Sequence, residues 1–288
     1  MSLTLGGGPL SRPTPGTGGA PGQLNVPLPA SPAHLLFLHD APLRVRGLLA
    51  GEVVLDTRRA RLLHETGLLP QWYVPAQDVR TDLLQRTATT TTCPFKGEAS
   101  YWTARVGDRV EEDLVWGYED PHPEISGLRG LLAVPFERLD AWYEEDEELL
   151  GHPRDPFHRV DTRRSTASVE VRLAREGAEP LVLARTSRAV ALAETGLPVR
   201  WYVPEADVAT DALEPSATTT QCPYKGVASY RTAVVEAPAD QEGAGARRVE
   251  DVAWTYPEPL DGARAVAGHL CFAGDGVEVL LDGTPAPS

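Results

Sequence analysis

Residues 89–101 read Thr89-Thr90-Thr91-Thr92-Cys93-Pro94-Phe95-Lys96-Gly97-Glu98-Ala99-Ser100-Tyr101. It recurs as Thr218-Thr219-Thr220-Gln221-Cys222-Pro223-Tyr224-Lys225-Gly226-Val227-Ala228-Ser229-Tyr230. β-Branched threonines favour an extended backbone, a residue before proline is held extended, and a Lys-Gly pair permits a turn. We therefore expect a strand in each copy that enters a bend at its cysteine.

The similarity between the two copies extends well beyond this stretch. Glu65-Thr66-Gly67-Leu68 recurs as Glu194-Thr195-Gly196-Leu197, and Trp72-Tyr73-Val74-Pro75 recurs as Trp201-Tyr202-Val203-Pro204, both displaced by 129 residues. After Tyr101 the displacement becomes 138, because the second copy has an insertion at 237–245 whose composition is typical of a surface loop. A period of about 130 residues is too long for a solenoid, so one globular domain has been duplicated.

Short runs rich in aliphatic and aromatic residues, separated by Gly, Pro and Asp, predict strands in each repeat. We expect a mainly β protein made of two tandem curled sheets, tent-like or barrel-like in form. The second repeat is expected to end in a strand at 276–283. One amphipathic helix is predicted after the first sheet, because apolar residues recur at helical spacing beyond Pro135; they are Phe136, Leu139, Trp142, Tyr143 and Leu149 or Leu150. The second repeat has no sequence counterpart of this segment, and the acidic run 144–148 is expected to be its solvated face.

The domain boundaries follow from composition. Residues 1–33 are rich in Gly and Pro with little periodic apolar content, so we expect a disordered tail. The first β domain is placed at 34–160, including the helix, and the second at 161–288. Between them, residues 152–158 are interpreted as an ordered, proline-rich connector.

Charge and cysteine content limit the classes of function. The balance of 27 Lys+Arg against 41 Asp+Glu gives a net charge of −14, which argues against nucleic acid as a partner. No apolar run reaches the roughly 18–20 residues needed to span a bilayer, so no membrane partner is expected. Three cysteines are too few for a disulfide framework, and we expect a cytoplasmic protein without a cofactor.

The two lysines are the most unusual feature of the composition. Arginine is the basic residue everywhere else, yet Lys96 and Lys225 occupy the same place in the two copies. A lysine is a compact point charge whose pKa responds readily to burial, which suggests an anion-binding or reactive amine. The alternative is structural: the stem packs beneath a strand and the ammonium pairs with Glu or Asp. The sequence leaves both interpretations open.

The cysteines of the repeated stretch are candidate nucleophiles. Cys93 and Cys222 each lie three residues before a lysine that would lower the pKa of the thiol. The alternative interpretation is a small buried apolar residue, as expected for Cys271. A shared histidine base is missing, because His64 aligns with Ala193. Neither repeat contains a CxxC or HExxH pair, so no metal site is predicted.

Other polar and aromatic residues recur in both copies and are candidate ligand contacts. If they face one cavity, they would clamp a small polar ligand through carboxylate and phenol groups over an indole surface. The alternative is that the aromatic residues fill the core while the acids cap turns or pair with arginine. The pairs are Glu65 with Glu194, Tyr73 with Tyr202, Asp78 with Asp207, Tyr101 with Tyr230, and Trp116 with Trp254.

These motifs resemble the bacterial domain of unknown function four-two-seven, which also carries a nucleotidyltransferase label. The resemblance covers about 40–160 and 165–283, and its most specific part is the Cys-Pro-aromatic-Lys-Gly core. It implies a small β-rich fold similar to the tent-like sheets of some zinc proteins, here without zinc ligands. The label implies nucleotide transfer. Neither repeat contains a glycine-rich phosphate loop or a DxD-type pair, which the two-metal chemistry of such enzymes needs.

Three hypotheses about function follow. The first is binding of a small polar or anionic ligand, with Lys96 and Lys225 as anion contacts. The second is an enzyme, either thiol-dependent through Cys93 and Cys222 or nucleotide-transferring. The third is an interaction module whose two repeats pack on each other.

Overall fold

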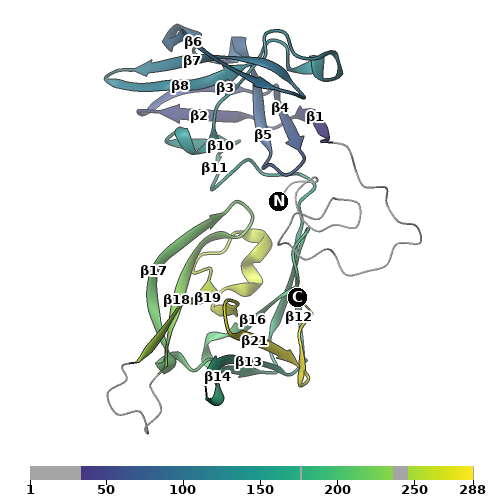
Figure 1. Cartoon of the computed structure of the whole chain (residues 1–288), viewed down its shortest axis with the longest axis vertical. Helices are drawn as coiled ribbons and strands as arrows, with labels where there is room; N and C mark the ends of the chain where they lie inside the picture. The colour runs from purple at the N-terminus through teal and green to yellow at the C-terminus, as the bar shows by residue number, and fades with distance from the viewer. Residues whose placement is uncertain (1–33, 176, 236–245, 288) are drawn as a thin grey trace, which may run out of the picture. The chain divides into compact units, whose positions relative to one another are not determined.

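The structure is a computed structural model that describes residues 34–175, 177–235 and 246–287. The chain divides into two compact units, Met1–His158 and Arg159–Ser288 (Figure 1). The predicted tail at 1–33 and the insertion at 237–245 lie outside the described residues. No helix among the described residues is long and apolar enough to cross a membrane.

The first unit contains an antiparallel seven-stranded sheet and a four-stranded sheet. The larger sheet has the order β1 (Leu36–Ala41), β4 (Ala60–Glu65), β5 (Gln71–Pro75), β9 (Leu131–Ala133), β8 (Arg109–Gly117), β7 (Gly97–Val106) and β6 (Leu84–Cys93). The smaller sheet has the order β11 (Glu147–Glu148), β10 (Ala141–Glu144), β2 (Val45–Leu49) and β3 (Glu52–Thr57). Four 3-10 helices connect the strands: η1 (Ala76–Asp78), η2 (Thr81–Leu83), η3 (Pro123–Leu128) and η4 (Phe136–Arg138).

The second unit repeats this arrangement. Its larger sheet has the order β12 (Val160–Arg164), β15 (Val190–Glu194), β16 (Arg200–Pro204), β20 (His269–Phe272), β19 (Arg247–Thr255), β18 (Gly226–Val235) and β17 (Leu213–Cys222). Its smaller sheet has the order β14 (Ala178–Thr186), β13 (Val169–Arg175), β21 (Val277–Leu281) and β22 (Thr284–Pro285). The 3-10 helices are η5 (Glu205–Asp207), η6 (Thr210–Ala212) and η7 (Asp261–Val266). The predicted mainly β fold is confirmed, and the strand orders show open sheets rather than closed barrels.

Strand register confirms the duplication residue by residue. Tyr101 pairs with Trp116 in the first unit, and Tyr230 pairs with Trp254 in the second. The predicted bend at the cysteine is also present: β6 ends at Cys93, and β7 begins at Gly97, whose φ is +106°. A Cβ at Gly97 would lie 3.3 Å from the carbonyl oxygen of Asp120, so this turn requires glycine for both conformation and space.

Alternation along the strands divides each large sheet into two faces. Trp72 packs in the core between the large and small sheets of the first unit, together with Val45, Leu55 and Trp142. Its neighbour Tyr73 belongs to a separate cluster with Leu63, Ala99, Tyr118, Ile125 and Leu128, the last two from η3. Successive side chains of a strand point to opposite faces, so the sheet has a core face and an outer face. We call the face that carries Tyr73 the outer face.

The predicted amphipathic helix after Pro135 is wrong. Residues 136–138 form the 3-10 helix η4, and the chain then enters β10, which pairs with β2. Trp142 is buried, stacks on Phe136 at 5.7 Å between ring centroids, and donates its indole N–H to the Phe136 carbonyl. The helical spacing arises because a short turn and a strand each place an aromatic residue on the same core.

The second repeat has no sequence counterpart of this segment, as expected, but its terminal strand occupies the same place in the fold. The predicted terminal strand is present as β21, which pairs with β13 as β10 pairs with β2. Two unrelated sequences therefore complete the small sheet of the two units in the same place. The side chains of the acidic run after Tyr143 include Asp146, which is fully exposed, and Glu145, which pairs with Arg58.

Candidate functional site

The lysine of each repeated stretch lies on the outer face and forms a buried ion pair. Lys96 donates from Nζ to Oε2 of Glu65, and both side chains are about nine-tenths buried. Lys225 and Glu194 form the same pair in the second unit. In each case the glutamate ends one strand and the lysine precedes another, so the pair joins distant parts of the sheet. This is the arrangement of the structural interpretation, and it gives each ammonium a carboxylate partner.

A histidine completes the ion pair of the first unit. Nε2 of His34 lies 2.7 Å from Oε1 of Glu65, and the imidazole stacks on Phe95 with 4.1 Å between ring centroids. Both carboxylate oxygens of Glu65 therefore have a nitrogen partner, one from Lys96 and one from His34.

A tyrosine and a tryptophan lie beside the ion pair in each unit. The indole N–H of Trp116 donates to the hydroxyl of Tyr73 at 3.3 Å, and Trp254 donates to Tyr202 at 3.2 Å. Burial raises the pKa of Tyr73 well above its usual range, with Tyr118, Glu65 and Cys93 close enough to contribute. The phenol is therefore neutral at every physiological pH and acts as a hydrogen-bonding group only.

A second tyrosine lies nearer the surface of the same face. The Tyr101 hydroxyl is 2.8 Å from Oγ1 of Thr91, and the Tyr230 hydroxyl is 3.1 Å from Oγ1 of Thr220. Both tyrosines are partly buried and pack against the outer-face cluster of their unit. The structure thus brings together five of the repeated positions that the sequence indicated in each unit: the glutamate, the lysine, both tyrosines and the tryptophan.

Asp78 and Asp207 lie elsewhere. Oδ1 of Asp78 accepts a hydrogen bond from Arg59 at 2.6 Å, and Oδ2 accepts one from the Thr57 hydroxyl at 2.6 Å. Asp207 makes the same contacts with Arg188 and Thr186. Hydrogen bonding to arginine holds the pKa of both carboxyl groups below the usual range. These aspartates fasten the 3-10 helices η1 and η5 to their units rather than adding to the Glu–Lys face.

The three cysteines are free thiols in different environments. Cys93 and Cys222 are partly buried and pack against the outer-face clusters, whereas Cys271 is buried. Burial raises the pKa of the Cys271 thiol to about 12, which agrees with its predicted core role. Within the described ranges, no three His, Cys, Asp or Glu side chains are grouped so as to hold a metal ion.

Two groups of residues in the first unit were not predicted from the sequence. The first is a histidine cluster: His64 is fully buried, its Nε2 lies 3.0 Å from Nε2 of His39, and its Nδ1 lies 3.8 Å from Oδ2 of Asp155. Burial lowers the pKa of His64 more than Asp155 raises it, so the neutral imidazole is favoured. Asp155 belongs to the predicted connector, which explains why residue spacing did not reveal the cluster.

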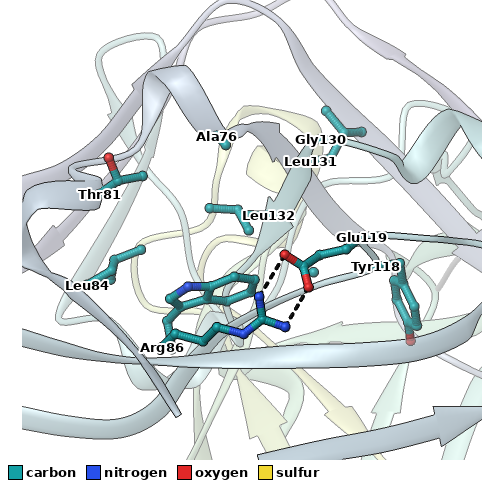
Figure 2. A pocket seen from close by; sticks show the side chains of 11 residues that line it. Ala76, Thr81, Leu84, Arg86, Tyr118, Glu119, Gly130, Leu131 and Leu132 are labelled. Atoms are coloured by element: carbon teal, nitrogen blue, oxygen red, sulfur yellow. Dashed lines mark hydrogen bonds and ion pairs between the residues drawn. The ribbon is translucent and has the colours of Figure 1, made fainter. Parts of the chain in front are cut away.

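The second group lines a pocket of about 430 Å³, which is formed by residues of β6 to β9 and of the neighbouring segments (Figure 2). Arg86 binds the carboxylate of Glu119 through both terminal nitrogens, at 3.0 and 2.6 Å. Its guanidinium lies over the Trp102 ring, 5.8 Å from the centroid. In the second repeat, Pro215 and Arg231 occupy the positions equivalent to Arg86 and Trp102. Identity between the two repeats therefore does not indicate this group.

The comparisons with known proteins agree with the duplicated fold. No curated protein matches the chain. One family model, described as a domain of unknown function (DUF427), matches residues 37–145 and again residues 161–283. These two segments cover most of both units, and the chain therefore belongs to the DUF427 family as a tandem repeat of its domain.

Proposed function

We propose that each unit binds a small polar ligand on its outer face, at the Glu–Lys pair and the neighbouring tyrosines and tryptophan. The observation that carries this proposal is the recurrence of the same three contacts in both units. These are the Glu–Lys ion pair, the Trp–Tyr hydrogen bond and the Tyr–Thr hydrogen bond. Two buried charges are costly to place in a protein, and replacing them by apolar residues is often neutral or stabilising. A role beyond stability is therefore a reasonable explanation for the pair.

The charge of this site favours a particular kind of ligand. Each ammonium is compensated by a glutamate, so a simple anion meets no excess positive charge unless it displaces the carboxylate. A neutral or zwitterionic molecule with both donors and acceptors matches the pair better. The Tyr101 and Tyr230 hydroxyls, which lie near the surface, would add hydrogen bonds to such a molecule.

A thermal-shift screen of small polar compounds tests this proposal. Wild type should be compared with Lys96→Met/Lys225→Met and with the milder Tyr101→Phe/Tyr230→Phe, which removes only two surface-near hydroxyls. Compounds that stabilise wild type should lose their effect in both double variants. If the same compounds stabilise all three proteins equally, the lysines and tyrosines do not form the binding site.

The remaining hypotheses stay predictions with their own tests. Calorimetry with ATP or GTP and Mg²⁺ tests nucleotide transfer, and an absence of binding removes it. Producing the two repeats separately tests the interaction module: stable, well-folded monomers would contradict an obligatory pair. A cytoplasmic location likewise stays a prediction.

A further inference from the structure

The pocket of the first unit shares no lining residue with the Glu–Lys pair or with the neighbouring Tyr73, Tyr101 and Trp116. Tyr101 and Trp102 are neighbours on β7 and so point to opposite sides of the sheet. Trp102, Leu84 and Leu132 pack with the core between the two sheets, and all three line the pocket. Its volume of about 430 Å³ lies within the range of small-molecule sites in proteins. An inference about this pocket therefore does not depend on the function proposed for the other face.

Apolar groups form most of the pocket, and one ion pair supplies its polar edge. Figure 2 shows the Arg86 guanidinium turned toward the Glu119 carboxylate, with Leu84, Leu131 and Leu132 around them. Both charged side chains are more than half exposed, at 55% and 54%. A pair so exposed adds little to stability, so the fold alone gives no strong reason for it.

The hydrogen bonds of Arg86 determine which of its N–H donors remain for a ligand. Nη1 donates to Glu119, and Nη2 donates to both Glu119 and the hydroxyl of Ser100. Ser100 is buried and donates in turn to Glu119 at 3.0 Å. Arginine has five N–H donors. Within the described part of the chain, the Nε–H and one Nη1–H of Arg86 have no protein acceptor, so the edge offers donors while carrying no net charge.

Gly117 lines the pocket in close contact with β9. A Cβ at this position would lie 2.9 Å from Cδ2 of Leu132 and 3.0 Å from the carbonyl oxygen of Leu131, so a larger residue would displace these neighbours. The φ angle of Gly117 is not positive, so the backbone itself does not demand glycine here. The second unit has Thr255 at this register position, opposite Ser229 as Gly117 is opposite Ser100.

The second unit differs at Arg86, Trp102 and Glu119, whereas Thr81 and Tyr118, which also line the pocket, recur as Thr210 and Tyr256. Pro215 pairs with Arg231 in the register where Arg86 pairs with Trp102, and Pro257 stands where the first repeat has Glu119. The ion pair and the indole surface therefore belong to the first unit alone among these equivalent positions.

We propose that the first unit binds an uncharged aromatic compound with a carbonyl acceptor, such as an aromatic amide, in the pocket lined by Trp102 and the Arg86–Glu119 pair. The rings lie among Leu84, Leu132 and the Trp102 indole, and the carbonyl oxygen accepts a hydrogen bond from Arg86. A carboxylate is disfavoured because it would face Glu119, which already compensates the guanidinium, in a chain of net charge −14.

Isothermal titration calorimetry on the full chain tests this with 2-naphthamide as the probe and 2-naphthoate as its anionic counterpart. We expect one naphthamide site per chain and binding at least tenfold tighter than that of naphthoate. Trp102→Arg, which introduces the residue of the second unit, should weaken naphthamide binding at least tenfold. The matched control, Arg231→Ala, should leave it unchanged.

A second variant distinguishes a lost ligand contact from misfolding. Arg86→Leu changes an exposed side chain, so the fold should persist, and it should weaken naphthamide binding several-fold while leaving 2-methylnaphthalene binding unchanged. Absence of naphthamide binding at millimolar concentration, two equal sites per chain, or naphthoate binding as tightly as naphthamide would overturn the proposal. Unchanged affinity in both Trp102→Arg and Arg86→Leu would overturn it as well.

Discussion

Replacing Lys96 by methionine tests how the buried ion pair is balanced. The substitution keeps most of the apolar stem but leaves the Glu65 carboxylate without its ammonium, in a position where the side chain is only 10% exposed. Removing one partner of a buried pair costs about 3–5 kcal/mol, because the remaining charge is buried and uncompensated. His34 still contacts the other carboxylate oxygen, so we expect the lower end of this range, about 3 kcal/mol.

Differential scanning calorimetry of the full chain measures this effect. For a domain of this size, a loss of about 3 kcal/mol lowers the midpoint of unfolding by roughly 10 °C. Lys225→Met makes the same change in the second unit, and the two variants together assign each transition to its unit. The second-unit variant is expected to shift the other transition by a similar amount, because Lys225 and Glu194 are equally buried.

The double variant Lys96→Met/Glu65→Leu separates the cost of an orphaned charge from the worth of the pair. Since an apolar replacement of a buried pair is often neutral, we expect the double variant to recover most of the stability that Lys96→Met loses. If Lys96→Met costs less than about 1 kcal/mol, or if the double variant is as unstable as the sum of the two single variants, the carboxylate is not held by the lysine and the reasoning fails.

Three further predictions follow from the geometry. With iodoacetamide at pH 8, Cys271 should stay unmodified in the native protein because burial raises its pKa to about 12, whereas fast modification of Cys271 would show that this strand opens readily. Asp78→Asn should lower the free energy of unfolding by about 1 kcal/mol at neutral pH. Because arginine lowers the Asp78 pKa, urea titrations should show that this difference disappears as the pH falls through the native pKa of Asp78. Burial lowers the His64 pKa, so the unfolded chain binds a proton at a higher pH than the native protein does. The free energy of unfolding should therefore decrease as the pH drops below about 6.5, by up to about 1.4 kcal/mol per pH unit. A His64→Asn variant with the same pH dependence as wild type would exclude this histidine as the cause.

The repeat made most of the fold predictable from the sequence. Two copies of one stretch with a proline after the cysteine and a glycine after the lysine predicted the strand and the bend, and both are present. The segment after Pro135 occurs only once, so no second copy constrains its prediction. The spacing of Phe136 and Trp142 is compatible with a helix and also with a turn followed by a strand, which is the observed structure.

The candidate site was predictable in part for the same reason. Residue identity in both copies indicated Glu65, Lys96, Tyr73, Tyr101 and Trp116, but spacing does not show which side of a sheet a residue faces. Asp78 recurs as faithfully as Glu65, yet it fastens a 3-10 helix to Arg59. The pocket beside Trp102 could not be predicted because Arg86, Trp102 and Glu119 differ between the copies, so residue identity did not indicate them.

The alternation of Tyr101 and Trp102 on β7 has a wider consequence for a duplicated protein. One strand supplies both an outer surface that is nearly identical in the two copies and an inner rim that is not. Substitutions can therefore accumulate on one side of the strand without disturbing the chemistry of the other side. In a duplicated sheet of this kind, both copies can retain the same outer face while one copy acquires a different pocket on its core face.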